Sequence, residues 1–174
     1  FKEVKIKNSI LGGIKMGLVV ETERLILVPL SEELWLKLQA VKNEDGEWPS
    51  EDVAKIIPDY IEKLKENPRV LGWGIWLTLD KNDYSVVGDI GFDGVPNELG
   101  EIKIGFGIVP SKRRQGYGFE AVKSMIDFIL NKGYINKITA KCDKWNIASI
   151  RILEKAGMRN TGCDEKYFYY EITQ

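Results

Sequence analysis

The chain has 174 residues, of which 44% are hydrophobic and 29% are charged, and its net charge is −1. This length predicts one globular domain with a substantial core, and the charge balance argues against broad nucleic-acid binding, which needs a basic face. The sequence contains no histidine, which excludes a Ser-His-Asp triad, a Cys-His pair and an HExxH metal site. Its two cysteines, Cys142 and Cys163, are too few for a disulfide scaffold or a four-ligand zinc site.

We expect neither a membrane span nor a signal peptide. No run of about 18 apolar residues is present, so no membrane span is predicted. Residues 10–14 are too short for a signal peptide and are interrupted by two glycines. The low cysteine content fits a reducing compartment, and we expect a cytoplasmic protein.

The first fifteen residues differ from the rest of the chain. Residues 1–15 begin with Phe1 and precede Met16, which could be a natural start. We interpret them as a leader or an added extension, with a native basic extension as the alternative. Residues 16–174 are then expected to form a single domain.

The first third of the chain predicts one strand and two helices. Residues 24–30 carry a run of apolar side chains that predicts a strand. Residues 31–42 begin with serine and two glutamates, which is typical of a helix start. Residues 50–66 predict a second helix with a serine cap, broken or kinked near Pro58.

The remainder predicts five strands and two further helices. The clearest element is the helix 116–132, whose apolar residues repeat at helical spacing and which ends at Gly133. The other expected elements are strands 73–79, 85–93 and 101–109, strand 137–142, helix 146–155 and strand 167–172. This order predicts a mixed α/β domain, with one layer of sheet and helices on its faces.

The stretch from Ile104 to Ala121, IGFGIVPSKRRQGYGFEA, carries the most chemical information. A strand ends before Pro110, three basic residues follow, and a glycine-rich turn opens a helix. A helix start offers unpaired N–H groups and partial positive charge, and glycines let an anion approach closely. The pattern predicts a pyrophosphate site, and a glycine-rich turn beside a solvated basic cluster is the alternative.

Two other phosphate-binding motifs fit less well. The GxxxxGK[ST] run of a P-loop is absent. Gly116, Gly118 and Ala121 match GxGxxA, and Asp143 follows at about the distance expected for a ribose contact. However, a Rossmann strand usually runs almost directly into its first glycine, and too little chain follows Asp143 for a second nucleotide-binding half.

Three motifs in order resemble the GNAT acetyltransferase superfamily. The run Arg113-Arg114-Gln115-Gly116-Tyr117-Gly118 resembles its coenzyme A signature, R/Q-x-x-G-x-G/A. Residues 146–158, NIASIRILEKAGM, are similar to its N-x-x-S…LEKxGF helix. Residues 21–27, ETERLIL, resemble the start of the RimJ/RimL branch. The resemblance covers about residues 21–172 and implies an α/β (α+β) GNAT fold with a mixed, mostly antiparallel sheet flanked by helices.

By this resemblance the chain is an N-acetyltransferase that uses acetyl-CoA as co-substrate and needs no metal. The acetyl group passes to a primary amine by direct attack on the thioester. The family pattern implies that backbone N–H groups of Phe106 and Ile108 contact the acetyl and pantetheine groups. The implied coenzyme-binding residues are Phe106, Ile108, Arg113, Arg114, Gln115, Gly116, Tyr117, Gly118 and Asn146.

The reaction also needs a proton acceptor for the amine and a proton donor for the leaving thiolate. The amine must lose a proton, and Glu101 is the candidate base, with Asp89 and Asp93 as weaker candidates and a surface carboxylate as the alternative role of Glu101. Many GNAT enzymes place a tyrosine seven residues after the asparagine, but Leu153 stands here. The RimJ/RimL branch implies Ser149 as the proton donor to the leaving thiolate.

The acceptor is expected to be a small-molecule amine or a protein N-terminus. Trp48 is a candidate for lining the acceptor site, because the region between the first two helices shapes substrate choice in the family. No nucleic acid or membrane partner is expected, and a homodimer is left open. A GNAT-fold protein that binds coenzyme A without catalysis is the alternative function.

Overall fold

The computed structural model describes residues 18–40 and 46–174. The expected extension 1–15 therefore lies outside the described residues. The strands are β1 (Val20–Glu21), β2 (Leu25–Pro29), β3 (Ile75–Asp80), β4 (Val86–Phe92), β5 (Glu101–Ile108), β6 (Lys137–Asp143), β7 (Arg159–Cys163) and β8 (Tyr167–Thr173). The helices are α2 (Glu32–Ala40), α3 (Glu51–Glu66), α4 (Tyr117–Leu130) and α5 (Ile147–Lys155), with 3-10 turns η1 (Pro68–Val70) and η2 (Pro110–Lys112).

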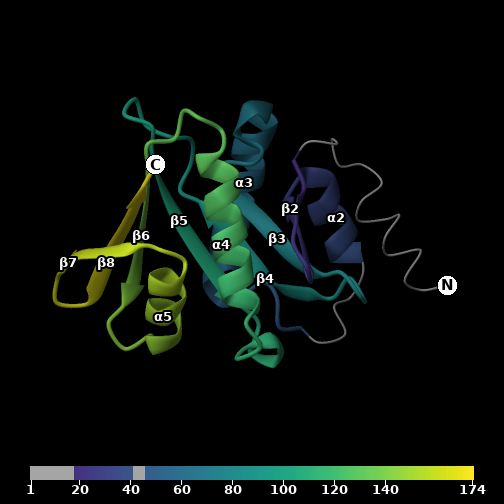
Figure 1. Cartoon of the computed structure of the whole chain (residues 1–174). Coiled ribbons are helices and arrows are strands. Elements are labelled where there is room, and N and C mark those ends of the chain that lie inside the picture. The colour runs from purple at the N-terminus through teal and green to yellow at the C-terminus, as the bar shows by residue number, and fades with distance from the viewer. Residues whose placement is uncertain (1–17, 41–45) are drawn as a thin grey trace.

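The strands form one eight-stranded sheet in the order β1-β2-β3-β4-β5-β6-β8-β7. Every neighbouring pair is antiparallel except β5 and β6, which are parallel. Figure 1 shows the long helix α4 crossing one face of the sheet. The predicted fold class, a mixed and mostly antiparallel sheet flanked by helices, is confirmed.

The alternation of side chains along the strands builds a core on each face of the sheet. Leu25 and Leu27 of β2 point to the face covered by α4, where they join Met125. Ile26 and Val28, the residues between and after them, belong to the second core. That core also contains the buried residues of α2 and α3, which are Leu34, Ile57, Ile61 and Leu64.

The expected helix starts on the second core's face are confirmed. The hydroxyl of Ser31 accepts a hydrogen bond from the N–H of Leu34, at 3.1 Å. Ser50 caps α3 by accepting from the N–H of Val53, at 3.4 Å. The expected break at Pro58 is absent, because α3 runs through this residue, and a kink there stays a prediction. Buried residues on both sides of the proline hold the helix to the sheet, which outweighs the lost backbone hydrogen bond.

Two strands are not predicted from the sequence. β1 has only two residues, too few for a recognisable pattern. β7 is exposed along its whole length, and its pairing with β8 shifts register between Asn160 and Gly162. A strand without a buried face has no hydrophobic alternation to reveal it. Among the described residues, no helix is long and apolar enough to cross a membrane.

Gly91 of β4 and Gly105 of β5 face each other across the two strands. Substituting each of them with alanine tests the packing of the sheet. A Cβ at Gly91 would lie 2.4 Å from the carbonyl oxygen of Gly74. Among the described residues, nothing outside its chain neighbours lies within 4 Å of a Cβ at Gly105. We predict that Gly91→Ala lowers the free energy of unfolding by about 1–3 kcal/mol, the usual cost of overpacking.

The matched substitution Gly105→Ala should change the free energy of unfolding by less than about 1 kcal/mol. Urea denaturation of both variants measures the difference. Equal destabilisation by the two substitutions would contradict the packing described here.

Candidate functional site

A pocket of about 650 Å³ lies where β5, the η2–α4 loop and α5 meet. Its walls come from three segments that are separate in the sequence. The lining residues are Phe106, Gly107, Ile108, Lys112, Arg113, Arg114, Gly116, Tyr117, Gly118, Phe119, Asn146, Ala148, Ser149, Arg151 and Ile152.

The β5 wall exists because β5 changes partners along its length. Residues 104–108 pair with β4, whereas residues 101–103 pair with β6. Beyond its third paired residue, Thr139, β6 pairs only with β8. β5 and β6 therefore separate after Lys103, and Figure 1 shows the two strands diverging toward α5. The separated part of β5 borders the pocket.

The backbone of this separated segment has a defined orientation. Val109 donates its N–H to Val87 at 3.0 Å, and the carbonyl of Lys103 accepts from Asp93 at 3.1 Å. The odd-numbered residues of β5 thus direct their backbone groups toward β4. Because these groups alternate along a strand, the N–H groups of Phe106 and Ile108 point toward the opening.

The start of α4 forms a second wall. Its N-cap Gly116 has a left-handed backbone, with φ of 83°, and supplies no side-chain cap. The N–H of Glu120 makes the first helical bond, to the carbonyl of Gly116 at 3.1 Å. The preceding N–H groups have no acceptor within the helix and carry its partial positive charge. Such a helix start is suited to bind an anion.

Positive side chains surround this helix start. Lys112, Arg113 and Arg114 line the pocket from the loop, and Arg151 lines it from α5. The guanidinium of Arg113 is anchored by a hydrogen bond from Nε to the carbonyl of Ile108, at 3.0 Å. The ammonium of Lys112 lies 3.6 Å from the carboxylate of Asp80. The concentration of cations makes the pocket fit a multiply charged anion such as a diphosphate.

The start of α5 supplies the third wall. The side-chain oxygen of Asn146 accepts a hydrogen bond from the N–H of Ser149, at 3.1 Å, and caps the helix. Both residues line the pocket. A residue with a side-chain amide and one with a hydroxyl therefore border the pocket.

A carboxylate on β4 lies beside a residue that lines the pocket. Asp89 pairs with the pocket residue Gly107, and a Cβ at Gly107 would lie 3.7 Å from its carboxylate. Because glycine has no side chain, residue 107 places no side chain against this carboxylate. Burial raises the pKa of Asp89 to about 6, against the opposing effect of a hydrogen bond from Trp48. That bond runs from Nε1 to Oδ2 and is 2.8 Å long.

The structure does not bring Glu101 to the pocket. Glu101 begins β5 and forms an ion pair with Lys137, which together with Asn97 lowers the pKa of its carboxyl. At the strand rise of about 3.3 Å per residue, it lies roughly 20 Å from Gly107. Asp93 forms an ion pair with Lys103, at 2.9 Å. Of these three carboxylates, only Asp89 pairs with a residue that lines the pocket.

All the predicted coenzyme-binding residues except Gln115 line the pocket. The side chain of Gln115 folds back and donates to the carbonyl of Ser111, at 3.0 Å. The phenol of Tyr117 donates to Asp80, at 2.7 Å. Arg151 was missed, although its spacing from Ala148 and Ile152 places all three on one helix face and could have indicated it.

Comparison with known proteins agrees with this geometry. A family model described as "Acetyltransferase (GNAT) domain" matches residues 24–159. The chain is 36% identical over 138 residues to the uncharacterized N-acetyltransferase YjdG of Bacillus subtilis (strain 168), covering 76% of this chain and 82% of the relative. A GNAT-family acetyltransferase from Bacillus anthracis matches in structure with a TM-score of 0.66 and 24% identity, over 89% of this chain and 98% of its own.

The ribosomal L7/L12 α-N-protein acetyltransferase RimL in complex with coenzyme A has the same fold. The TM-score is 0.68 at 18% identity, over 89% of this chain and 97% of RimL. At such identities these structures establish the fold alone. The family model, which spans most of the chain, establishes the family. The chain belongs to the GNAT acetyltransferase family.

Proposed function

We propose that the chain is an N-acetyltransferase that transfers an acetyl group from acetyl-CoA to a primary amine. The observation that carries this proposal is one pocket with two complementary walls. One wall is the edge of β5 that no longer pairs with β6, and the other is the basic start of α4. A long co-substrate with a charged diphosphate and an amide-bearing arm has groups that match both walls.

The residues of the pocket fit the parts of coenzyme A. The N–H groups at the start of α4 and the cations around them would hold the diphosphate. The N–H groups of Phe106 and Ile108 would hydrogen-bond the pantetheine arm and the acetyl oxygen, and Asn146 would contact the arm from the other side. When bound, acetyl-CoA supplies the acetyl group as a thioester, which an amine attacks directly.

Asp89 is the proposed general base. A lysine amine has a pKa near 10.4 and an α-amine near 8, so each must lose a proton before attack. A carboxylate with a pKa of about 6 is ionised at neutral pH and more basic than an ordinary aspartate. Trp48 holds this carboxylate in place. This contact also supports the assignment of Trp48 to the acceptor side of the site.

Ser149 is the proposed proton donor to the leaving thiolate. Its N–H is fixed by Asn146, so its side chain starts from a defined position in the pocket wall. Because a thiolate is a good leaving group, we expect protonation to contribute less than removal of the amine proton.

The acceptor is proposed to be a protein N-terminus or a small amine. RimL is named for acetylating a ribosomal protein. A chimera of spermidine N-acetyltransferase from Vibrio cholerae and hSSAT shares the fold, with a TM-score of 0.66 at 13% identity over 86% of this chain and 95% of its own. The fold therefore accommodates both kinds of acceptor, and a cytoplasmic, RimJ/RimL-like enzyme remains our expectation.

An assay of thiol release tests the proposed function. With acetyl-CoA and a panel of peptide N-termini, spermidine and amino acids, we predict release of free thiol that depends on at least one amine. Acetyl-CoA should also raise the melting temperature, and NAD should not. Stabilisation by coenzyme A without turnover of any amine would favour the binding-only alternative, and stabilisation by NAD alone would contradict the proposal.

Replacement of the proposed base gives a second test. Asp89→Asn should lower kcat/KM by about 10²- to 10⁴-fold, the usual contribution of a general base. In the wild type, kcat/KM should rise with pH through about 6 as Asp89 loses its proton, and the variant should lack this step. Glu101→Gln is the matched control and should remain near wild type. A large loss in Glu101→Gln alone would reverse the assignment.

The stability of the Asp89 variant separates catalysis from folding. The folded-state pKa of about 6 lies above the ordinary 3.8, so the folded state loses stability as pH rises between these values. At pH 8 the ionised carboxylate costs up to about 3 kcal/mol. Asparagine removes this cost and keeps an oxygen for Trp48. Asp89→Asn should therefore melt above wild type at pH 8, and a lower melting temperature would undermine this interpretation.

Ser149→Ala tests the proton donor. We predict that kcat falls by about tenfold, below the typical range of acid catalysis because the thiolate leaves readily, while coenzyme A affinity stays near wild type. Ser124→Ala is the control, since that hydroxyl bonds a carbonyl within α4 and lies outside the pocket lining. Loss of affinity without loss of kcat would assign Ser149 to binding.

A further inference from the structure

The loop before α4 has a backbone that needs support. Arg114 has a positive φ of 61° and Gly116 one of 83°. The left-handed region is unfavourable for residues other than glycine, so Arg114 adopts it only where surrounding contacts hold it. Gly116 itself gives α4 no side-chain cap. The amides proposed to bind the diphosphate therefore depend on contacts from elsewhere in the chain.

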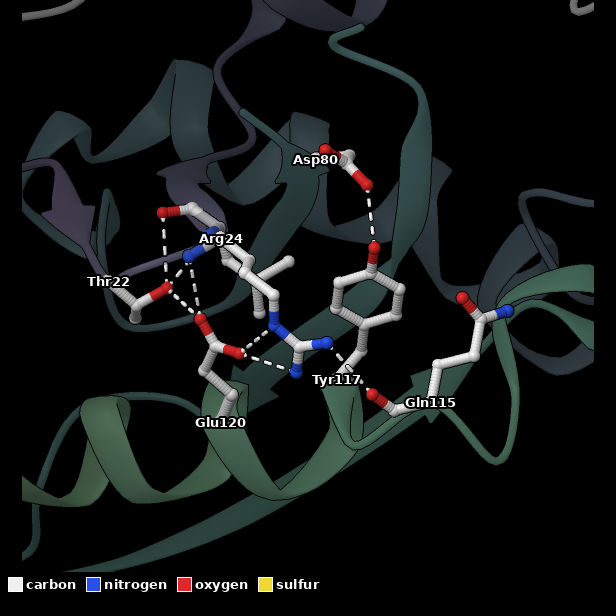
Figure 2. Close-up of polar contacts among 7 residues, drawn as sticks. Thr22, Arg24, Asp80, Gln115, Tyr117 and Glu120 are labelled. Atoms are coloured by element: carbon white, nitrogen blue, oxygen red, sulfur yellow. Dashed lines mark hydrogen bonds and ion pairs between the residues drawn. The ribbon is translucent and has the colours of Figure 1, made fainter. Parts of the chain in front are cut away.

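Arg24, just before β2, supplies such contacts across 91 to 96 residues of sequence, as Figure 2 shows. Its Nε donates to Glu120 Oε2 at 2.7 Å, and its Nη2 lies 2.7 Å from the same oxygen. Its Nη1 donates to the carbonyl of Gln115 at 2.9 Å. Its guanidinium also stacks on the ring of Tyr117, 4.4 Å from the centroid. One side chain thus joins the loop to the first turn of α4.

The bond to Gln115 fixes the orientation of a peptide group. In a trans peptide the carbonyl and the following N–H point in opposite directions. Because Arg24 binds the carbonyl of Gln115, the N–H of Gly116 is turned away from Arg24. Gly116 lines the pocket, so this N–H belongs to the set of amides available to an anion there.

Arg24 also compensates a negative charge near the proposed diphosphate. Glu120 lies in the first turn of α4, and burial alone would raise the pKa of its carboxyl. Hydrogen bonds from Thr22 and from Arg24 outweigh burial and hold that pKa below its ordinary value. Thr22 donates at 2.5 Å and the N–H of Arg24 at 2.9 Å. The carboxylate is therefore ionised but paired with a guanidinium.

We propose that Arg24 is a positioning residue for acetyl-CoA, which orients the Gln115–Gly116 peptide and so sets the affinity for the diphosphate. This inference rests on the proposed function, because it takes coenzyme A as the ligand of the pocket. Arg24 acts through the loop and is not assigned a catalytic role.

The test compares two ligands that differ in the diphosphate. Coenzyme A affinity is measured by calorimetry, and binding of pantetheine, which lacks the nucleotide and its diphosphate, is measured by NMR titration. Arg24→Met should weaken coenzyme A binding by about tenfold, the scale of one charge-assisted hydrogen bond, and leave pantetheine binding unchanged. Arg159→Met is the matched control, since Arg159 forms a comparable 2.8 Å ion pair with Glu171 on β8. It should change neither affinity.

Two more variants keep the test decisive. Arg24→Lys retains the positive charge, but its ammonium cannot bind Glu120 and Gln115 with one planar group. It should therefore also weaken coenzyme A binding. If Arg24→Met does not fold, Arg24→Lys takes its place in the comparison. The double variant Arg24→Met/Glu120→Gln removes the uncompensated carboxylate. It should recover only part of the affinity for coenzyme A, because the Gln115 carbonyl still lacks its hydrogen bond from Arg24.

The outcomes separate this inference from the proposed function. A wild-type chain that does not bind coenzyme A overturns the proposed function. A wild-type chain that binds it while Arg24→Met and Arg24→Lys bind equally well overturns only the role of Arg24. An equal loss for both ligands, or full recovery in the double variant, would also overturn positioning through the peptide.

Discussion

The separation of β5 from β6 is the constraint on which the site depends. Three residues of β5 pair with β6, and the next five pair only with β4. An unpaired strand backbone is normally protected or used for recognition. Here it lines a pocket that α4 and α5 close from two other sides. The same backbone brings Gly107 next to Asp89, so binding and proton transfer would take place on two neighbouring strands, β5 and β4.

The start of α4 is fixed from two sides around Tyr117. On one side, its phenol donates to the buried carboxylate of Asp80, which also lies near Lys112. On the other, Arg24 covers its ring and holds Glu120. A binding group gains affinity when its geometry is set before the ligand arrives. The two networks give the proposed diphosphate site this preorganisation through Asp80, Arg24 and Glu120, which are outside the pocket lining.

Much of the fold follows from local patterns, whereas the choice among carboxylates does not. The amphipathic period of α4, the serine caps and the basic glycine-rich loop are local signals. Which carboxylate faces the pocket depends on strand register and on where β5 leaves β6, and a shift of one residue reverses the face of a strand. The sequence therefore ranked Glu101 above Asp89, although only Asp89 of the two pairs with a residue that lines the pocket. The positioning role proposed for Arg24 could likewise not be predicted from sequence, because its partners lie more than 90 residues away.

The most direct test of this account is a crystal structure of the chain with acetyl-CoA. We predict that the diphosphate lies within hydrogen-bonding distance of the amides between Gln115 and Gly118, that the pantetheine arm lies in the opening between β5 and β6, and that Asp89 faces the acetyl group. A diphosphate bound away from the start of α4, or an arm that runs outside this opening, would contradict it.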